Sequence, residues 1–308
     1  MSPPMEGMSK PAAVSAKSVF LRRSGSTLVL WSVVAAVFFS HRAWAFGGLL
    51  TVLTVLATIE LFCMMRQAGM MVPAGFAVAL ATAYSLILNT ALIRQGVVPS
   101  WLDPAFFTIA VIGAFALQLR RPVEGIATLQ PVACTVMAMV YLPFLCGFLS
   151  RIVMGSDTDV GGLVSREGAC LLLWVVAVTK FTDMGAYLTG SWIGRHKMIP
   201  HISPAKTWEG FFGALAFALL AGCGLRALLP GPLACFGGYG HVVVLSLLLA
   251  VLAVLGDLAE SLIKRALGAK DSGRILPGIG GSLDLLDSLC FTAPVACFYL
   301  QWMRNIAP

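Results

Sequence analysis

The sequence predicts an all-α, polytopic membrane protein, and three observations support this prediction. Hydrophobic residues make up 58% of the 308 residues and charged residues only 11%. The mean hydropathy is +0.89. Apolar runs long enough to cross a bilayer recur along the chain. This composition excludes an ordinary soluble globule, and one helical bundle can take up the whole length.

About nine apolar segments are expected to form transmembrane helices in this bundle. Breaker residues mark several boundaries between them, as in the turn at 230–232. The motif 43–45 is typical of a signal-peptidase site, but the apolar pattern resumes directly after it, which favours an uncleaved first span. The segments are expected at about 27–40, 44–65, 72–93, 104–119, 129–150, 168–190, 208–229, 240–267 and 286–304.

The distribution of basic residues predicts the orientation. With nine spans and a cytoplasmic N-terminus, roughly fourteen of the 21 Lys and Arg residues fall on the cytoplasmic side. The chain then divides into a mobile cytoplasmic tail (1–26), N-terminal transmembrane helices (27–160) and a C-terminal region with the candidate active site (161–308). The loops near 195–206 and 264–274 are expected to share the cytoplasmic face and to form a polar cleft there.

Two function classes are disfavoured by composition. The net charge of +7 comes from basic residues between apolar spans. They form no long basic run, so we expect no nucleic-acid partner. The eight cysteines are scattered without CxxC or zinc-ligand spacing, which favours small buried thiols over a metal centre.

An acid-rich segment, 256–288, holds five of the fourteen acidic residues. Asp257 and Glu260 are spaced to share one face of a helix. A glycine-rich turn then leads to a second helical start with Asp284 and Asp287 three residues apart. Carboxylates on two facing helices, with lysines between them, suit a metal-assisted reaction of phosphates.

Ionisable residues also lie inside the predicted spans. Lys180, Asp183 and Tyr187 share one helical face, and such groups are functional candidates because they are costly in a membrane. The structural alternative is a Lys180–Asp183 ion pair that only fixes helix packing. Glu60 lies in another span, and for this residue we expect a structural role, with Arg66 as a candidate partner.

The segment 203–210 predicts an anion site. Ser203 directly before Pro204 is typical of a helix N-cap followed by proline in the first turn. Free backbone N–H groups there, beside Lys206, would bind phosphate. The alternative is a capped helix flanked by basic side chains with no ligand.

These motifs resemble the phosphatidate cytidylyltransferase (CDP-diglyceride synthetase) family. The similarity lies in 203–210 and in 261–288, where Ser-x-x-Lys-Arg, Lys-Asp, Gly-Gly and Leu-Asp-x-x-Asp-Ser recur in the family's order. The N-terminal half is similar only in being a series of hydrophobic spans. Two positions depart from the family pattern: Ile279 stands where histidine is usual, and Leu285 where arginine is usual.

The resemblance implies that CTP and phosphatidate give CDP-diacylglycerol and pyrophosphate. It further implies a multi-pass protein of the cell inner (cytoplasmic) membrane, with N-terminus and active site facing the cytoplasm, and suggests a homodimer. We expect Mg²⁺ on Asp257, Asp284 and Asp287, and the family implies a second cation, with K⁺ as candidate. Lys206 and Lys264 are the expected catalytic cations. The expected substrate-binding residues are Asp183, Tyr187, Ser203, Lys206, Thr207, Glu209, Glu260, Ser261, Arg265, Lys270, Asp271, Gly280 and Gly281.

Three other functions stay open at this point. A CTP-dependent kinase-like transferase acting on polyisoprenoid lipids would need similar residues. An ion-coupled membrane transporter could use intramembrane carboxylates, although the charges cluster at one membrane face. An inactive scaffold that keeps the fold is suggested only by Ile279 and Leu285.

Overall fold

The structure is a computed structural model of the chain that describes residues 29, 31–155, 162–269, 271–273 and 280–306. The expected tail, Lys270 and Ile279 lie outside these residues. The described part is helical apart from one two-stranded hairpin, which confirms the all-α prediction. Its elements are α2 (Ala43–Gln67), α3 (Ala74–Gln95), α4 (Leu102–Gln118), η1 (Gly125–Thr128), α5 (Gln130–Met139), η2 (Val140–Phe144), α6 (Leu145–Met154), α7 (Arg166–Ile193), β1 (Lys197–Ile199), β2 (Ser203–Thr207), α8 (Trp208–Leu228), η3 (Ala234–Phe236), α9 (Tyr239–Ala266) and α10 (Ser282–Ile306).

Seven helical spans in the described residues are long and apolar enough to cross a membrane. Two further apolar helices, Trp31–Ser40 and Leu102–Gln118, are shorter. Together these helices coincide with the expected apolar segments, so the multi-pass membrane fold is confirmed. The span Gly125–Met154 changes from α to π geometry at η2, where Pro143 lies inside the helix and cannot donate a backbone hydrogen bond.

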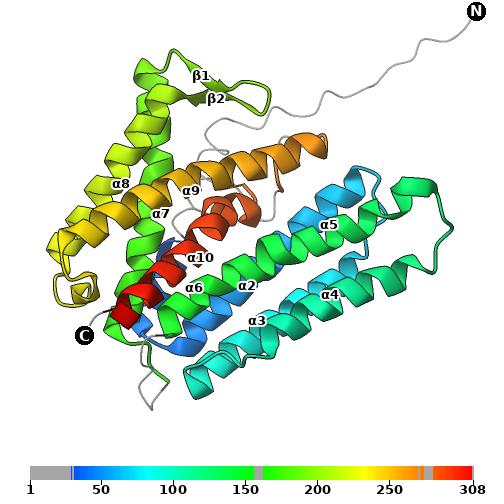
Figure 1. Cartoon of the computed structure of the whole chain (residues 1–308), viewed down its shortest axis with the longest axis horizontal. Helices are drawn as coiled ribbons and strands as arrows, with labels where there is room; N and C mark the ends of the chain where they lie inside the picture. The colour runs from blue at the N-terminus through cyan, green and yellow to red at the C-terminus, as the bar shows by residue number, and fades with distance from the viewer. Residues whose placement is uncertain (1–28, 30, 156–161, 270, 274–279, 307–308) are drawn as a thin grey trace, which may run out of the picture.

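α10 lies between α9 and α6 (Figure 1). α7 packs along α8, α8 contacts α9, and α9 contacts α10. On its other sides α10 packs against α6 and α2. α10 therefore joins the N-terminal helices to the C-terminal ones, and it carries two of the expected metal ligands, Asp284 in its first turn and Asp287 in the next.

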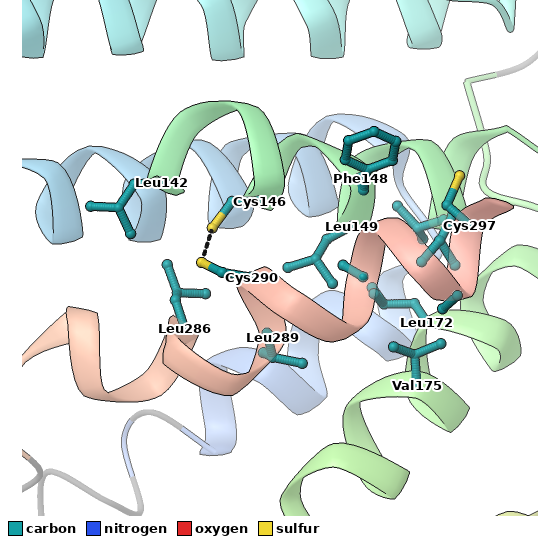
Figure 2. Packing of buried hydrophobic residues seen from close by; sticks show 14 of the residues in the cluster. Leu142, Cys146, Phe148, Leu149, Leu172, Val175, Leu286, Leu289, Cys290 and Cys297 are labelled. Atoms are coloured by element: carbon teal, nitrogen blue, oxygen red, sulfur yellow. Dashed lines mark hydrogen bonds between the residues drawn. The ribbon is translucent and has the colours of Figure 1, made fainter. Parts of the chain in front are cut away.

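One side of α10 is anchored in the hydrophobic core (Figure 2). Leu286 and Leu289 of α10 lie among buried side chains of α6 and α7, such as Leu149 and Val175. The Sγ atoms of Cys146 and Cys290 are 3.3 Å apart between α6 and α10, as free thiols. Close packing of this kind leaves little freedom for the backbone on which the acidic residues stand.

The helix start expected at Ser203 is wrong. Residues 203–207 form strand β2, antiparallel to β1, and α8 begins at Trp208. Thr207 is the actual N-cap, because its Oγ1 accepts the Gly210 N–H at 3.1 Å. Pro204 is tolerated in β2 because a two-stranded ribbon has only edge strands.

Glycines allow α7 and α8 to pack closely. A Cβ on Gly210 would lie 2.8 Å from the Ala186 carbonyl oxygen, and a Cβ on Gly213 would overlap the Thr189 side chain. We expect Gly213→Ala to lower the free energy of unfolding by about 1–3 kcal/mol through overpacking. Thermal unfolding of the purified protein in detergent measures this loss.

Gly224→Ala is the matched control on the same helix, since a Cβ on Gly224 meets no described atom within 4 Å. It should leave the unfolding temperature unchanged or raise it, because alanine favours helix more than glycine does. Equal destabilisation by the two substitutions would contradict the close packing of α7 on α8.

Two tryptophans mark the end of the bundle that carries the hairpin. Trp192 lies in the last turn of α7 and Trp208 in the first turn of α8, and their side chains are 85% and 49% exposed. Tryptophan is enriched where transmembrane helices meet the membrane surface. This end of α7 and α8 therefore has the character of a membrane–water boundary.

Candidate active site

Three carboxylates gather between α9 and α10. Asp257 and Glu260 come from α9 and Asp287 from α10, and one oxygen of each lies within 4.8 Å of the others. Glu260 is only 2% exposed and Asp287 6%. We call these three residues the acidic cluster. The helical spacing puts Asp257 and Glu260 on one face, as expected, and the α9–α10 packing brings Asp287 opposite them.

The three carboxylates of the acidic cluster pair with three lysines, which come from β2, α9 and α7. Asp257 Oδ2 is 2.8 Å from Lys206 Nζ of β2. Glu260 Oε2 is 2.7 Å from Lys264 Nζ of α9. Asp287 Oδ1 is 3.8 Å from Lys180 Nζ of α7. Three carboxyl groups and three lysines thus lie together in a partly buried space, where charges interact strongly.

Asp284 lies beside the acidic cluster rather than in it. Its Oδ1 is 3.1 Å from Lys264 Nζ, and its Oδ2 accepts the Gly281 N–H at 2.8 Å. Lys264 therefore bridges Glu260 and Asp284. The third carboxylate of the acidic cluster is therefore Glu260, whereas the sequence analysis expected Asp284. A metal-binding role for Asp284 stays a prediction.

A second polar contact ties α7 to α10. Ser288 Oγ lies 3.2 Å from Asp183 Oδ2, and Lys180 Nζ lies 3.4 Å from the same oxygen. Lys180 thus contacts both Asp183 and Asp287. The sequence marked Lys180 and Asp183 as one helical face, and the structure adds that this face meets the acidic cluster.

A cavity of about 460 Å³ adjoins the acidic cluster and shares Asp257 with it. α7, α8, α9 and the hairpin form its walls. Lys206 and Asp183 both line the cavity. Lys206 also pairs with Asp257, and Asp183 also bonds Ser288, as described above. The cavity volume falls in the range typical of small-ligand sites. The lining includes Asp183, Tyr187, Lys197, Ser203, Lys206, Thr207 and Asp257.

Lys206 connects the hairpin with α9. Its Nζ donates to the Val254 carbonyl at 3.3 Å in addition to pairing with Asp257. Arg265 Nε lies 3.5 Å from the Ile202 carbonyl. The two loops that the charge count placed at one membrane face therefore meet in the structure.

Other expected site residues have different surroundings. The Glu209 carboxylate accepts the Arg195 and His196 backbone N–H groups at 3.1 and 3.2 Å and contacts His196 Nδ1 at 2.6 Å. It therefore holds the chain ahead of β1. Ser261 is half-buried on α9, and Asp271 is exposed. For these three residues a contact with substrate stays a prediction.

Gly280 shows why glycine is needed in the turn before α10. Its φ of +116° lies in a region that side chains rarely adopt, and a Cβ there would be 2.7 Å from Asp284 Oδ2. The next amide, Gly281 N–H, bonds that same carboxylate oxygen. The turn thus brings the backbone against Asp284.

The contact that Glu60 makes with α10 was not predicted from the sequence. The Glu60 side chain is 2% exposed, and its Oε2 accepts from Ser282 Oγ at 2.8 Å and from Leu283 N at 2.9 Å. The expected partner, Arg66, is exposed instead. Only its burial cost inside an apolar span could have drawn attention to Glu60.

The acidic cluster fits a hard divalent cation. All of its donors are carboxylate oxygens, the ligands that Mg²⁺ prefers. Glu260 Oε1 is buried and has no hydrogen-bond partner among the described residues. A buried carboxylate oxygen without a partner is costly, and a bound cation would satisfy it. Asp257, Glu260 and Asp287 could therefore hold Mg²⁺, with Asp284 next to them.

Fold and site together define a multi-pass membrane protein with a charged pocket at one end of its helices. The sequence matches the cytidylyltransferase family over residues 21–303. The chain belongs to this family. It is 30% identical to phosphatidate cytidylyltransferase of Mycobacterium bovis over 287 residues, covering 87% of this chain and 83% of the relative.

Two further relatives match shorter stretches of the chain at higher identity. Phosphatidate cytidylyltransferase of Brucella suis is 45% identical over 133 residues, covering 43% of this chain and 47% of the relative. The uncharacterized protein YnbB of Escherichia coli is 36% identical over 159 residues, covering 52% and 50%. Family membership makes the chain a nucleotidyltransferase homologue and confirms the resemblance inferred from its motifs.

Proposed function

We propose that this protein transfers CMP from CTP to phosphatidate, forming CDP-diacylglycerol and pyrophosphate with Mg²⁺ as cofactor. The observation that carries the proposal is the cavity that shares Asp257 with the acidic cluster. It offers a triphosphate-sized space with a lysine in its wall and a metal-binding set at its end. The names of the relatives support the choice of substrates.

In this reaction a phosphate oxygen of the lipid attacks the α-phosphorus of CTP, and the bond from that phosphorus to the bridging oxygen breaks. Pyrophosphate leaves with the electron pair. The lipid phosphate is already an anion near neutral pH, so no separate general base is needed. The two anions repel each other, and the site must neutralise and align them.

The lysines supply part of that neutralisation. Lys206 Nζ and Lys264 Nζ each lie within 2.8 Å of a carboxylate oxygen. When phosphates enter, these ammonium groups are within reach to bind them and to stabilise charge on the departing pyrophosphate. Mg²⁺ held by Asp257, Glu260 and Asp287 would supply Lewis-acid stabilisation of the phosphate oxygens.

We further propose that the protein lies in the cell inner membrane with this end facing the cytoplasm. CTP is available on that side, and the excess of basic residues in the corresponding loops favours the same orientation. Accessibility of a single cysteine placed in the β1–β2 turn, in a cysteine-free background, to a membrane-impermeant thiol reagent tests this. Labelling in inverted but not in right-side-out vesicles is the expected result.

Isotope position separates the proposed reaction from a lipid kinase. Purified protein is incubated with Mg²⁺, phosphatidate and CTP labelled at either the α- or the γ-phosphorus. The α-label should enter the lipid fraction and the γ-label should appear in pyrophosphate. Transfer of γ-label to a polyisoprenoid alcohol would establish the kinase instead, and ion-driven uptake without either transfer would establish a transporter.

Lys206→Ala is expected to raise the KM for CTP by about tenfold and to lower kcat, because a charge-assisted contact to phosphate is lost. Steady-state kinetics with varied CTP measures both constants. Arg94→Ala is the control, since Arg94 is an exposed cation in the last turn of α3. Wild-type constants for Lys206→Ala would remove Lys206 from the nucleotide site.

A further inference from the structure

A buried carboxylate from the N-terminal helices bonds the first turn of α10. Glu60 stands on α2, 222 residues before Ser282 in the sequence. Its Oε2 accepts from both Ser282 Oγ and the Leu283 backbone N–H. The first N–H groups of a helix have no partner within the helix, and a carboxylate there also interacts favourably with the helix dipole.

Gly273 and Gly281, on either side of the undescribed residues 274–279, lie against this carboxylate. A Cβ on Gly273 would lie 2.6 Å from Glu60 Oε1, and a Cβ on Gly281 would lie 2.7 Å from Glu60 Oε2. Neither position could carry a side chain with Glu60 in place. Gly273, before the turn in the sequence, and Gly281, after it, thus lie against the same buried carboxylate.

Capping the N-terminus of α10 with a buried carboxylate costs free energy. Glu60 Oε1 is buried and has no hydrogen-bond partner among the described residues. A short polar residue within α10 could bond the same N–H without burying a charge. A carboxylate from α2 accomplishes something that a local cap cannot, because it fixes where α10 begins relative to the rest of the bundle.

The residues that follow this contact are those of the candidate active site. Asp284 is adjacent to Leu283, and its carboxylate is bonded to Gly281 N–H and Lys264. Asp287 lies one turn further along and belongs to the acidic cluster. A shift of the first turn of α10 would therefore move both aspartates with respect to α9.

We propose that Glu60 is a positioning residue that holds the first turn of α10, and with it Asp287, in register with Asp257 and Glu260. Glu60 itself contacts Ser282 and Leu283 and none of the acidic cluster. Its importance for catalysis rests on the proposed function, whereas its hold on α10 does not. Groups that orient metal ligands from behind typically change metal affinity or activity by 10- to 100-fold when removed.

Two substitutions remove this contact in different ways. Glu60→Gln keeps the size of the side chain and an acceptor but removes the charge. Gly273→Ala leaves Glu60 unchanged and displaces its carboxylate, because the described atoms nearest to the new Cβ all belong to Glu60. Thr58→Val is the control: its Oγ1 bonds only the Thr54 carbonyl within α2 at 2.8 Å, and its side chain is equally buried.

Hydrogen exchange of the purified, substrate-free protein tests the contact directly. Peptides covering 280–287 should exchange roughly fivefold faster in Glu60→Gln and in Gly273→Ala, the effect expected of a lost helix cap. Peptides from α3, α7 and α8 should be unchanged, as should all peptides of Thr58→Val. Unchanged exchange at 280–287, or equal acceleration in every helix, would overturn the proposal.

Metal affinity and kinetics test the consequence for the site. Mn²⁺ binding without substrate, followed by electron paramagnetic resonance, should weaken about tenfold in both variants. In assays kcat should fall while the KM for CTP stays within about twofold, since the cavity lining does not include α2 or α10. Wild-type Mn²⁺ affinity, or a rise in KM alone, would contradict a positioning role.

A double substitution tests whether Gly273→Ala acts through Glu60. If Gly273→Ala acts only by displacing Glu60, then Gly273→Ala combined with Glu60→Gln should bind Mn²⁺ no more weakly than the worse single variant; additive losses would overturn the proposal. Failure of the wild-type protein to form CDP-diacylglycerol would refute the proposed function alone, because exchange and Mn²⁺ binding are measured without CTP or lipid.

Discussion

Asp257→Asn is expected to lower turnover by roughly 10³-fold or more while the protein still inserts into membranes. Asp257 belongs to both the acidic cluster and the cavity lining. Asparagine keeps the shape but removes the negative charge, so the cluster binds a cation more weakly and Lys206 loses its partner. Pyrophosphate release by purified protein measures the effect.

Glu167→Gln is the matched control for this substitution. It makes the same change of carboxylate to amide. Glu167 lies in the first turn of α7 and forms an exposed ion pair with Arg304. Surface pairs of this kind contribute little to stability, and turnover should stay at the wild-type level. Near-normal turnover of Asp257→Asn would refute the assignment of Asp257 to the metal site.

Lys264→Met is expected to reduce both stability and activity. The Lys264 side chain is 16% exposed and lies 2.7 Å from Glu260 and 3.1 Å from Asp284. Removing one partner of a buried ion pair leaves an uncompensated charge and costs about 3–5 kcal/mol. The unfolding temperature in detergent should fall markedly, and turnover should fall about 100-fold if Lys264 binds phosphate as proposed.

A second substitution separates these two effects. Glu260→Gln added to Lys264→Met removes the more deeply buried of the two carboxylates that lose Lys264, and it should restore much of the lost stability. Activity should not return, because the double variant lacks both a candidate metal ligand and a phosphate-binding cation. Recovery of activity together with stability would show that Lys264 has only a structural role.

The fold could be predicted well because its main determinant is local. Each membrane span can be recognised from its own length and hydropathy, independently of the helices that pack against it. The start of α8 could not be predicted in this way. Ser203 and Pro204 carry the local signal of a helix start, but pairing with β1 makes the same residues a strand. Tertiary contacts outweighed local preference there.

The candidate site was predictable along single helices and unpredictable between them. Spacing placed Asp257 with Glu260, and Lys180 with Asp183, because residues three apart share a helix face. No spacing rule gives the register of α9 against α10, which brings Glu260 rather than Asp284 together with Asp257 and Asp287. The contact of Glu60 with α10 spans more than two hundred residues and has no sequence signal beyond a charge in an apolar segment.

The exposed tryptophans at the hairpin end of α7 and α8 bear on how a two-chain lipid would reach the cavity. Each CH₂ group withdrawn from a bilayer costs about 0.8 kcal/mol, so extracting two acyl chains would be prohibitive. Exposed tryptophans such as Trp192 and Trp208 are typical of helix ends at headgroup depth, and Thr207, next to Trp208, lines the cavity. If phosphatidate is the substrate, as proposed, it can present its phosphate at headgroup depth while its chains remain in the membrane, so chain length should affect turnover only weakly.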